Sequence, residues 1–185
     1  MTARPVHTTP RKPASSGFTL MELLIVIAMI AILATLAAPS FNTLRVNQKL
    51  ASTASDLFAS TLQARNEAMR LNRQVTIAPM TGNDWKTGWR VYVDMNVNGS
   101  YDSGSDTLVI TAPPIEGNYT VTGKDEGTPP TGFTFDSRGF LRGVTNSRVV
   151  IKSVLTGREK QVIVYQTGRA RQCDPKLNSA CAGGI

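Results

Sequence analysis

Two arginines near the C-terminus have the type and spacing of a phosphate-binding pair. Arg169 and Arg171 belong to the run Gly168-Arg169-Ala170-Arg171 and are separated by one residue. We expect this run to follow the last strand in an extended conformation, in which alternate side chains project to the same side. Guanidinium groups bind phosphate oxygens in bidentate fashion, and Gly168 allows a sharp turn ahead of the pair. The pattern therefore indicates a site for phosphate groups.

Further basic side chains accompany this pair. Period-two counting puts Arg148 and Lys152 on one face of a preceding strand, and Lys176 lies between the two cysteines. Residues 138–185 contain nine basic and two acidic side chains, a net charge of +7. Residues 74–137 contain three basic and eight acidic side chains, a net charge of −5. This asymmetry favours an anionic partner, although the same charges also suit a solubilising surface.

Cys173 and Cys181 are the two cysteines of the chain. Their C-x7-C spacing closes a small loop, and it lacks the additional Cys or His that a zinc site needs. Exported compartments are oxidising, so in a protein with an export signal we expect the two to form a disulfide. Such a bond would restrict the backbone that carries Arg171.

Catalytic chemistry is poorly supported by the composition. The single histidine, His7, precedes the expected cleavage point described below, so the mature chain would lack a His-dependent nucleophile system or a His metal site. No paired-acid motif stands out. We therefore expect no enzyme activity, no cofactor and no metal site.

One acidic segment partly matches a calcium-binding loop. The segment from Asp94 to Asp106 begins D-x-N-x-N-G, as in an EF-hand. The twelfth position, however, is Ser105 instead of a bidentate Glu, and the residues that follow predict a strand. Asn98-Gly99 is typical of a hairpin turn because both residues tolerate positive φ. A structural turn is therefore favoured over calcium binding.

The N-terminal region has the order of features of a processed membrane anchor. Basic residues come first, Gly17 follows, and only then does an apolar run begin, with no charge from Leu23 to Leu44. A secretory signal peptide instead has its cleavage site after the apolar run. Cleavage after Gly17 would leave the apolar residues 18–38 on the mature protein. Their 21 residues match the roughly 20 that a helix needs to cross the hydrocarbon core.

Glu22 interrupts this apolar segment. A lone carboxylate in a membrane helix costs roughly 2.5–3.5 kcal/mol on insertion scales, so it should have a partner. A positive charge at the same depth would serve, and the new α-amino group of Phe18 in a neighbouring subunit could provide it.

The remaining periodicities predict one long helix and a set of strands. Past Pro39, apolar residues recur at three- and four-residue spacings to about Asn72, which predicts an amphipathic continuation of the helix. Beyond it, β-branched and aromatic runs alternate with clusters of Gly, Pro, Asn and Asp. A long helix packed on an antiparallel sheet is an α+β arrangement. The expected strands are 74–78, 89–95, 107–111, 119–122, 133–136, 148–154 and 161–166.

Gly17-Phe18-Thr19-Leu20 and Glu22, followed by the apolar run, resemble the class III signal of type IV pilins and type II secretion pseudopilins. The resemblance implies cleavage between Gly17 and Phe18 by a prepilin peptidase, N-methylation of Phe18, and docking between pilin subunits guided by Glu22. It also implies a kink at Pro39 and the ladle-shaped α+β fold of type IV pilins.

The resemblance also sets an expected organisation and location. Residues 1–17 form the leader and residues 18–72 the helix, with 18–38 as the transmembrane and filament-core part and 39–72 as the amphipathic part. Residues 73–185 form a globular β domain with a basic C-terminal loop. The protein is expected to cross the inner membrane once with this domain in the periplasm, and later to join an extracellular pilus.

The segment from Trp89 to Asp106 and the Gly-Arg-x-Arg motif are similar to FimT-type minor pilins of the FimT/GspH family. That resemblance implies that Gly168, Arg169 and Arg171 bind extracellular DNA for uptake by retracting pili, as in natural transformation. The other basic candidates named above, Arg148, Lys152 and Lys176, rest on charge and spacing alone.

Such binding is expected to be mainly electrostatic and weakly dependent on base sequence. The basic tail has only two aromatic residues, Phe140 and Tyr165, which argues against base stacking as the main mode. The alternative is a structural subunit without DNA binding, either a priming minor pilin or a type II secretion pseudopilin at a filament tip. Its basic tail would then pair with an acidic face of a neighbouring subunit.

Overall fold

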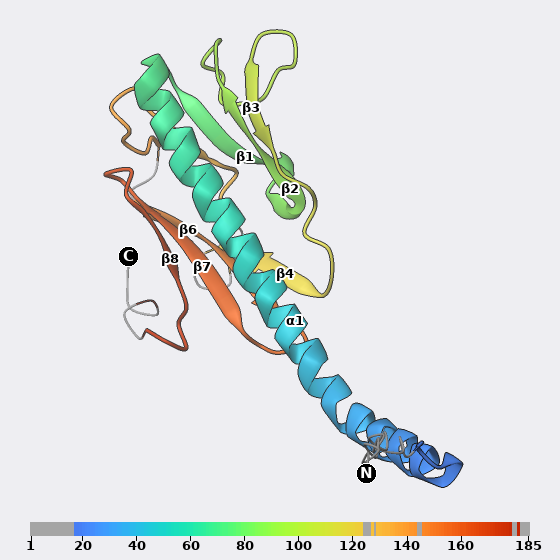
Figure 1. Cartoon of the computed structure of the whole chain (residues 1–185). Coiled ribbons are helices and arrows are strands. Elements are labelled where there is room, and N and C mark those ends of the chain that lie inside the picture. Colours follow the sequence, from blue (N-terminus) through green and yellow to red (C-terminus); the bar gives the residue numbers. More distant parts are fainter. Residues whose placement is uncertain (1–16, 124–126, 128, 144–145, 179–180, 182–185) are drawn as a thin grey trace, which may run out of the picture. The chain divides into compact units, whose positions relative to one another are not determined.

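A computed structural model describes residues 17–123, 127, 129–143, 146–178 and 181, and for residues 36–39 it describes the backbone alone. The leader expected at residues 1–17, including His7, lies outside the described residues except for Gly17. The chain forms two compact units, residues 1–41 and 42–185. Helix α1 (Leu20–Leu71) contributes residues to both units (Figure 1).

Helix α1 begins with a capped first turn. The Oγ1 atom of Thr19 accepts a hydrogen bond from the backbone N–H of Glu22 at 3.2 Å. The carbonyl oxygen of Thr19 accepts the N–H of Leu23 at 3.1 Å. A Thr followed three residues later by a Glu is a capping-box pattern, and an acidic side chain in the first turn favours the helix dipole. Glu22 thus has a local role at the helix start, besides the docking role expected from the sequence.

The apolar side chains of the first unit are exposed. Phe18 is 81% exposed and Leu33 is 65% exposed. Within the described part of the chain, no single helix has the length and hydropathy of a membrane span. The segments Leu20–Thr35 and Ser40–Leu71 have the required length and hydropathy only when they are taken together. The expected kink at Pro39 falls on residues 36–39, whose side chains lie outside the described part.

In the second unit, α1 carries an apolar stripe that packs on two sheets. Five side chains of this stripe recur at spacings of three, four and seven residues and are at most 1% exposed. They share one core with strands from both sheets, including the ring pair Trp85 and Phe133, whose centroids are 5.6 Å apart. The indole Nε1 of Trp85 donates to the carbonyl of Pro130 at 2.8 Å. The five stripe residues are Leu50, Ala54, Leu57, Ala64 and Ala68.

The strands form two antiparallel sheets of four strands each. The first has the order β3-β2-β1-β5 and the second β4-β6-β7-β8, and the single core between them and α1 makes the unit α+β, as predicted (Figure 1). All seven expected strands are present as β1 to β7; β3 and β4 have the expected bounds, and the other five have shifted ends. The bounds are β1 Val75–Thr81, β2 Asp84–Val93, β3 Thr107–Thr111, β4 Tyr119–Thr122, β5 Phe133–Phe135, β6 Asn146–Ser153, β7 Glu159–Tyr165 and β8 Ala170–Cys173.

The loop between β2 and β3 is a hydrogen-bonded turn. The two carboxylate oxygens of the buried Asp94 accept the N–H groups of Asn98 at 3.2 Å and Gly99 at 2.8 Å. Asp106 accepts the N–H of Met95 at 3.0 Å. Among the residues that the structure describes, no group of three or more His, Cys, Asp or Glu side chains is placed to hold a metal ion. The backbone of the loop therefore uses these carboxylates, which agrees with the structural turn favoured by the sequence.

Candidate nucleic-acid interface

The Gly-Arg-x-Arg run lies in a β-hairpin, which corrects its expected position after the last strand. Val164 of β7 pairs with Ala170 of β8, and Ile163 pairs with Arg171. The turn is closed by the N–H of Tyr165, which donates to the carbonyl of Arg169 at 2.9 Å. Strand β8 is an edge strand of its sheet. The backbone of Arg171 is thus held first by its pairing with β7.

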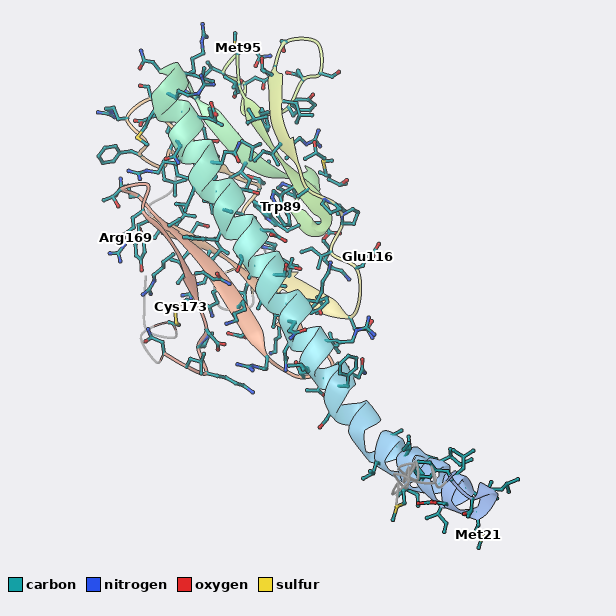
Figure 2. All side chains as sticks on the ribbon, viewed as in Figure 1. Met21, Trp89, Met95, Glu116, Arg169 and Cys173 are labelled. Carbon is teal, nitrogen blue, oxygen red and sulfur yellow. A yellow bond between two sulfur atoms is a disulfide. The ribbon has the colours of Figure 1, made fainter. Side chains whose placement is uncertain are left out.

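The two arginines face away from the main core. Ala170, between them, packs against that core, so the alternation along the strand directs Arg169 and Arg171 to the opposite face. Arg169 is exposed at the hairpin end of β8, and Cys173 lies at the far end of the same strand (Figure 2). Arg171 is half-buried, with its guanidinium carbon 5.7 Å from the ring centroid of Tyr165. The pair therefore combines one exposed surface cation with one held against an aromatic ring.

Gly168 joins this hairpin to a second loop. Its φ is +77°, and an added Cβ would lie 1.7 Å from the carbonyl oxygen of Gly139, so only glycine fits. Arg65 of α1 donates from Nε to the same Gly139 carbonyl at 3.0 Å. The N–H of Leu141 donates to the carbonyl of Gln166 at 3.0 Å. The motif glycine thus places the arginine hairpin against the loop that follows β5.

That loop, residues 136–142, carries two more basic side chains, Arg138 and Arg142, and it contacts the hairpin through Gly139. The sequence alone did not indicate these two residues. Asp136 caps it by accepting the N–H groups of Arg138 at 2.9 Å and Phe140 at 3.0 Å. Partial burial would raise the pKa of Asp136, but hydrogen bonds from Arg138 and from the two N–H groups hold it below its usual value. Arg138 pairs with Asp136 at 2.8 Å and lies over the ring of Phe140, 5.5 Å from its centroid. Arg142 is exposed nearby in the chain.

The expected disulfide between Cys173 and Cys181 is present. Both cysteines are buried and pack with Ile163 and Tyr165 in a small cluster, separate from the main core. The bond closes the loop after β8, which includes the exposed Lys176. Because the cluster contains Tyr165, the disulfide supports the ring on which Arg171 rests.

Asp174 ties the disulfide loop to β7. Its Oδ2 atom lies 3.2 Å from Nη2 of Arg158 and 3.0 Å from Nζ of Lys160, and its Oδ1 accepts the N–H of Lys176 at 3.0 Å. Burial would raise the pKa of Asp174, but the hydrogen bonds from Lys160 and Lys176 and the charges of Lys160 and Arg158 lower it below its usual value. Arg158 and Lys160 share this one carboxylate, so they are poorer candidates for binding phosphates than the exposed Arg169.

Asp174 is expected to contribute to the acid sensitivity of the fold. Its pKa is lower folded than unfolded, so its carboxylate stabilises the fold above the unfolded value of about 3.9, and this is lost as the pH falls through the folded pKa. Asp174→Asn should therefore flatten the dependence of the unfolding free energy on pH between about 5 and 2. Urea unfolding at a series of pH values measures this, with the exposed Asp56→Asn as control. An acid limb as steep in Asp174→Asn as in the wild type would contradict it.

Arg148 and Lys152 lie on one face of β6, as period-two counting indicated, and line a hollow of about 630 Å³ on the outer face of the second sheet. Arg148 is only 6% exposed, and its Nη1 donates to Oε1 of Gln161 at 3.1 Å. The sheet register places Arg148, Ile163 and Arg171 in one row across β6, β7 and β8. At this depth Arg148 offers a duplex little surface, whereas Arg169 at the hairpin is exposed.

The comparisons with known proteins identify the family. The model of the Type II transport protein GspH family matches residues 53–168, and that of the prokaryotic N-terminal methylation motif matches residues 12–38. The pilin-like protein PilA1 of Thermus thermophilus is 31% identical over 160 residues, which cover 84% of this chain and 96% of that protein.

Solved structures agree on the fold. The type IV minor pilin FimU of Pseudomonas aeruginosa matches with a TM-score of 0.54 and 23% identity, over 68% of this chain and 88% of that one. The minor pseudopilin EpsH of the Vibrio cholerae Type 2 Secretion System matches with a TM-score of 0.50 and 13% identity, over 69% and 98%. The family model covers more than half of the chain and PilA1 is similar along almost its whole length. The chain therefore belongs to the GspH family of type IV pilin-like proteins.

Proposed function

We propose that this minor pilin binds extracellular DNA through the hairpin of β7 and β8 and serves in DNA uptake. The observation that carries the proposal is the position of Arg169 and Arg171, which face away from the core on an edge strand. Paired guanidinium groups on a hydrogen-bonded backbone suit phosphate oxygens at little cost in ordering. Gly168 acts indirectly, because its close contact with Gly139 positions the hairpin.

The surrounding charge supports this choice of partner. Residues 138–185 carry a net +7, and the basic residues counted there include three more exposed side chains, Arg138, Arg142 and Lys176. Binding of this kind neutralises phosphates and releases counterions, so its affinity falls steeply with salt and depends little on base sequence. Arg148 and Lys152 are left out of the proposed contact surface because Arg148 is buried and hydrogen-bonded to Gln161, and Lys152 is half-buried.

The test is DNA binding by the full chain in detergent. Fluorescence anisotropy with a labelled duplex across a salt series is expected to give weak, salt-sensitive binding. Arg169→Gln with Arg171→Gln should lower the affinity at low salt by about tenfold or more, and reduce the slope of log affinity against log salt by about 2, since two phosphate contacts are lost.

The matched control removes the same charge elsewhere. Arg45 and Lys49 are exposed on α1 and line a hollow with Leu155, which follows β6 and precedes β7. The hairpin of the arginine pair is at the other end of β7. Arg45→Gln with Lys49→Gln should leave the affinity within about twofold of the wild type. Equal losses in the two double variants would refute a localised site and leave only general attraction by net charge.

Delivery to a filament is the second part of the proposal. A prepilin peptidase cleaves between Gly17 and Phe18, Phe18 is N-methylated, and residues 18–38 hold the protein in the inner membrane with residues 73–185 in the periplasm. Glu22 then guides docking on other pilin subunits by pairing with the α-amino group of Phe18 in a neighbour. The match of residues 12–38 to the N-terminal methylation motif supports this sequence of events.

A second candidate function is a purely structural subunit, such as a pseudopilin of a type II secretion system. The fold likeness to the pseudopilin EpsH favours it. In that role the basic hairpin would pair with an acidic face of a neighbouring subunit, and any binding of DNA at low salt would be weakened equally by the two double variants. The anisotropy experiment separates the two functions.

A further inference from the structure

An exposed phenylalanine stands beside the arginine hairpin. Phe140 is 45% exposed, although burying a phenylalanine stabilises a fold by about 1.5–3 kcal/mol. The contact between Gly139 and Gly168 and the hydrogen bond from Leu141 to Gln166 keep its loop against the hairpin. The fold therefore presents an aromatic ring next to the proposed DNA contacts.

The ring belongs to one of two matching pairs. Arg138 lies over Phe140 at 5.5 Å, and Arg171 lies over Tyr165 at 5.7 Å. Each pair combines a guanidinium group, which binds phosphate and also stacks on bases, with an aromatic ring that offers a face to a base. The first pair lies in the loop after β5, and the second lies on β7 and β8 of the other sheet. The contact between Gly139 and Gly168 and the hydrogen bond from Leu141 to Gln166 join the two segments. The two aromatic residues of the basic tail thus each neighbour a residue of the loop–hairpin contact, Phe140 between Gly139 and Leu141 and Tyr165 beside Gln166.

The loop that carries Phe140 is held by its own backbone. The N–H of Phe140 donates to Oδ1 of Asp136 at 3.0 Å, and its carbonyl accepts the N–H of Asp136 at 2.9 Å. The N–H of Arg142 donates to the carbonyl of Thr134 in β5 at 2.8 Å. Phe140 is therefore exposed on an ordered loop, and a ligand that covers its ring meets little cost of ordering.

We infer that this surface binds unpaired bases, with Phe140 as the main stacking platform and Tyr165 as a second one, so that single-stranded DNA is bound more tightly than duplex. The inference rests on the proposed function and names its ligand more closely. In a duplex the bases are already stacked and only phosphates reach the arginines, whereas a single strand can turn its bases onto the rings. Composition alone counted only two aromatic residues and gave base stacking a minor role, whereas this inference gives it a larger one because the loop of Phe140 contacts the hairpin that follows Tyr165.

The experiment compares three labelled strands with the full chain in detergent: a 20-nucleotide oligothymidine, a duplex of equal length, and an abasic strand with the same sugar–phosphate backbone. The wild type should bind the oligothymidine about five- to tenfold more tightly than the abasic strand. Phe140→Leu should lose about fivefold in affinity for the oligothymidine and change less than twofold for the duplex and the abasic strand. Phe140→Tyr, which keeps a ring, should bind like the wild type.

Leu177→Ala is the matched control, because Leu177 is an exposed apolar side chain, 77% accessible, on the disulfide loop. It should bind all three strands like the wild type. Equal binding of the oligothymidine and the abasic strand by the wild type overturns the inference without any variant, as does unchanged binding in Phe140→Leu. If the inference about stacking fails in this way but the double arginine variant still loses affinity for the duplex, the proposed function stands. If the wild type binds no strand, both fail.

Discussion

Gly168→Ala is expected to destabilise the domain by about 2–4 kcal/mol and to lower its melting temperature by about 6–12 °C. Two costs add. A left-handed backbone such as φ +77° costs an alanine about 1–2 kcal/mol, and a Cβ at 1.7 Å from the carbonyl oxygen of Gly139 forces the two loops apart. Nε of Arg65, 2.8 Å from the same Cβ position, would move as well. Thermal and urea unfolding measure the loss.

Gly157→Ala isolates the dihedral cost. Gly157 also has a positive φ, +63°, but an added Cβ meets nothing within 4 Å. This variant should lose only about 1 kcal/mol. The difference between the two losses of unfolding free energy is the effect of the contact with Gly139. DNA affinity should fall only in Gly168→Ala, because only that substitution shifts the hairpin. Equal losses of stability in both variants would show that the two loops separate without cost.

Removal of the disulfide by Cys173→Ala with Cys181→Ala is expected to lower the unfolding free energy by about 2–3 kcal/mol. The two cysteines are eight residues apart. In the chain-entropy model, closing a loop of that size lowers the entropy of the unfolded chain, which raises its free energy by about 2.5 kcal/mol at 25 °C. Urea unfolding of the variant, and of the wild type with and without reductant, provides the measurement. Reduction should reproduce most of the loss in the wild type and cause none in the variant.

DNA affinity is expected to change much less than stability in this variant. Arg171 pairs with Ile163 in the sheet, so its backbone keeps its position when the loop after β8 is released. We expect a loss of duplex affinity below about threefold, mainly through looser packing of Tyr165 in the small cluster. A tenfold loss in a folded variant would mean that the disulfide, instead of the strand pairing, positions the arginines.

The elements that the sequence predicted well are those with a local pattern. Apolar residues at helical spacing and runs of Val, Ile and aromatic residues between turn residues indicate α1 and β1 to β7 from neighbouring positions alone. Strand β8 was missed because Ala170–Cys173 contains two polar residues and no β-branched or aromatic residue. Its pairing with β7 stabilises it as an edge strand. The start of β2 at Asp84 was hidden by Gly88, which has a φ of +88° and lies against the carbonyl of Ala112.

The candidate site was predictable in part for the same reason. The outward direction of Arg169 and Arg171 follows from the alternation of side chains along a strand, which is local. The approach of Gly139 to Gly168 joins residues far apart in the sequence, and no periodicity encodes it. The burial of Arg148 likewise depends on its neighbours in the sheet. The sequence alone predicts that a basic residue on a polar face is exposed.

The cap of α1 determines what a processing enzyme would meet. Thr19 is the N-cap, so the peptide bond between Gly17 and Phe18 precedes the first helical residue, Leu20, and no helical hydrogen bond has to break before that bond enters a catalytic cleft. If the helix began a turn earlier, the scissile bond would be inside it and the rate of maturation would include an unwinding step. In the proposed maturation, Thr19 thus separates the bond to be hydrolysed, between Gly17 and Phe18, from the helix that begins at Leu20.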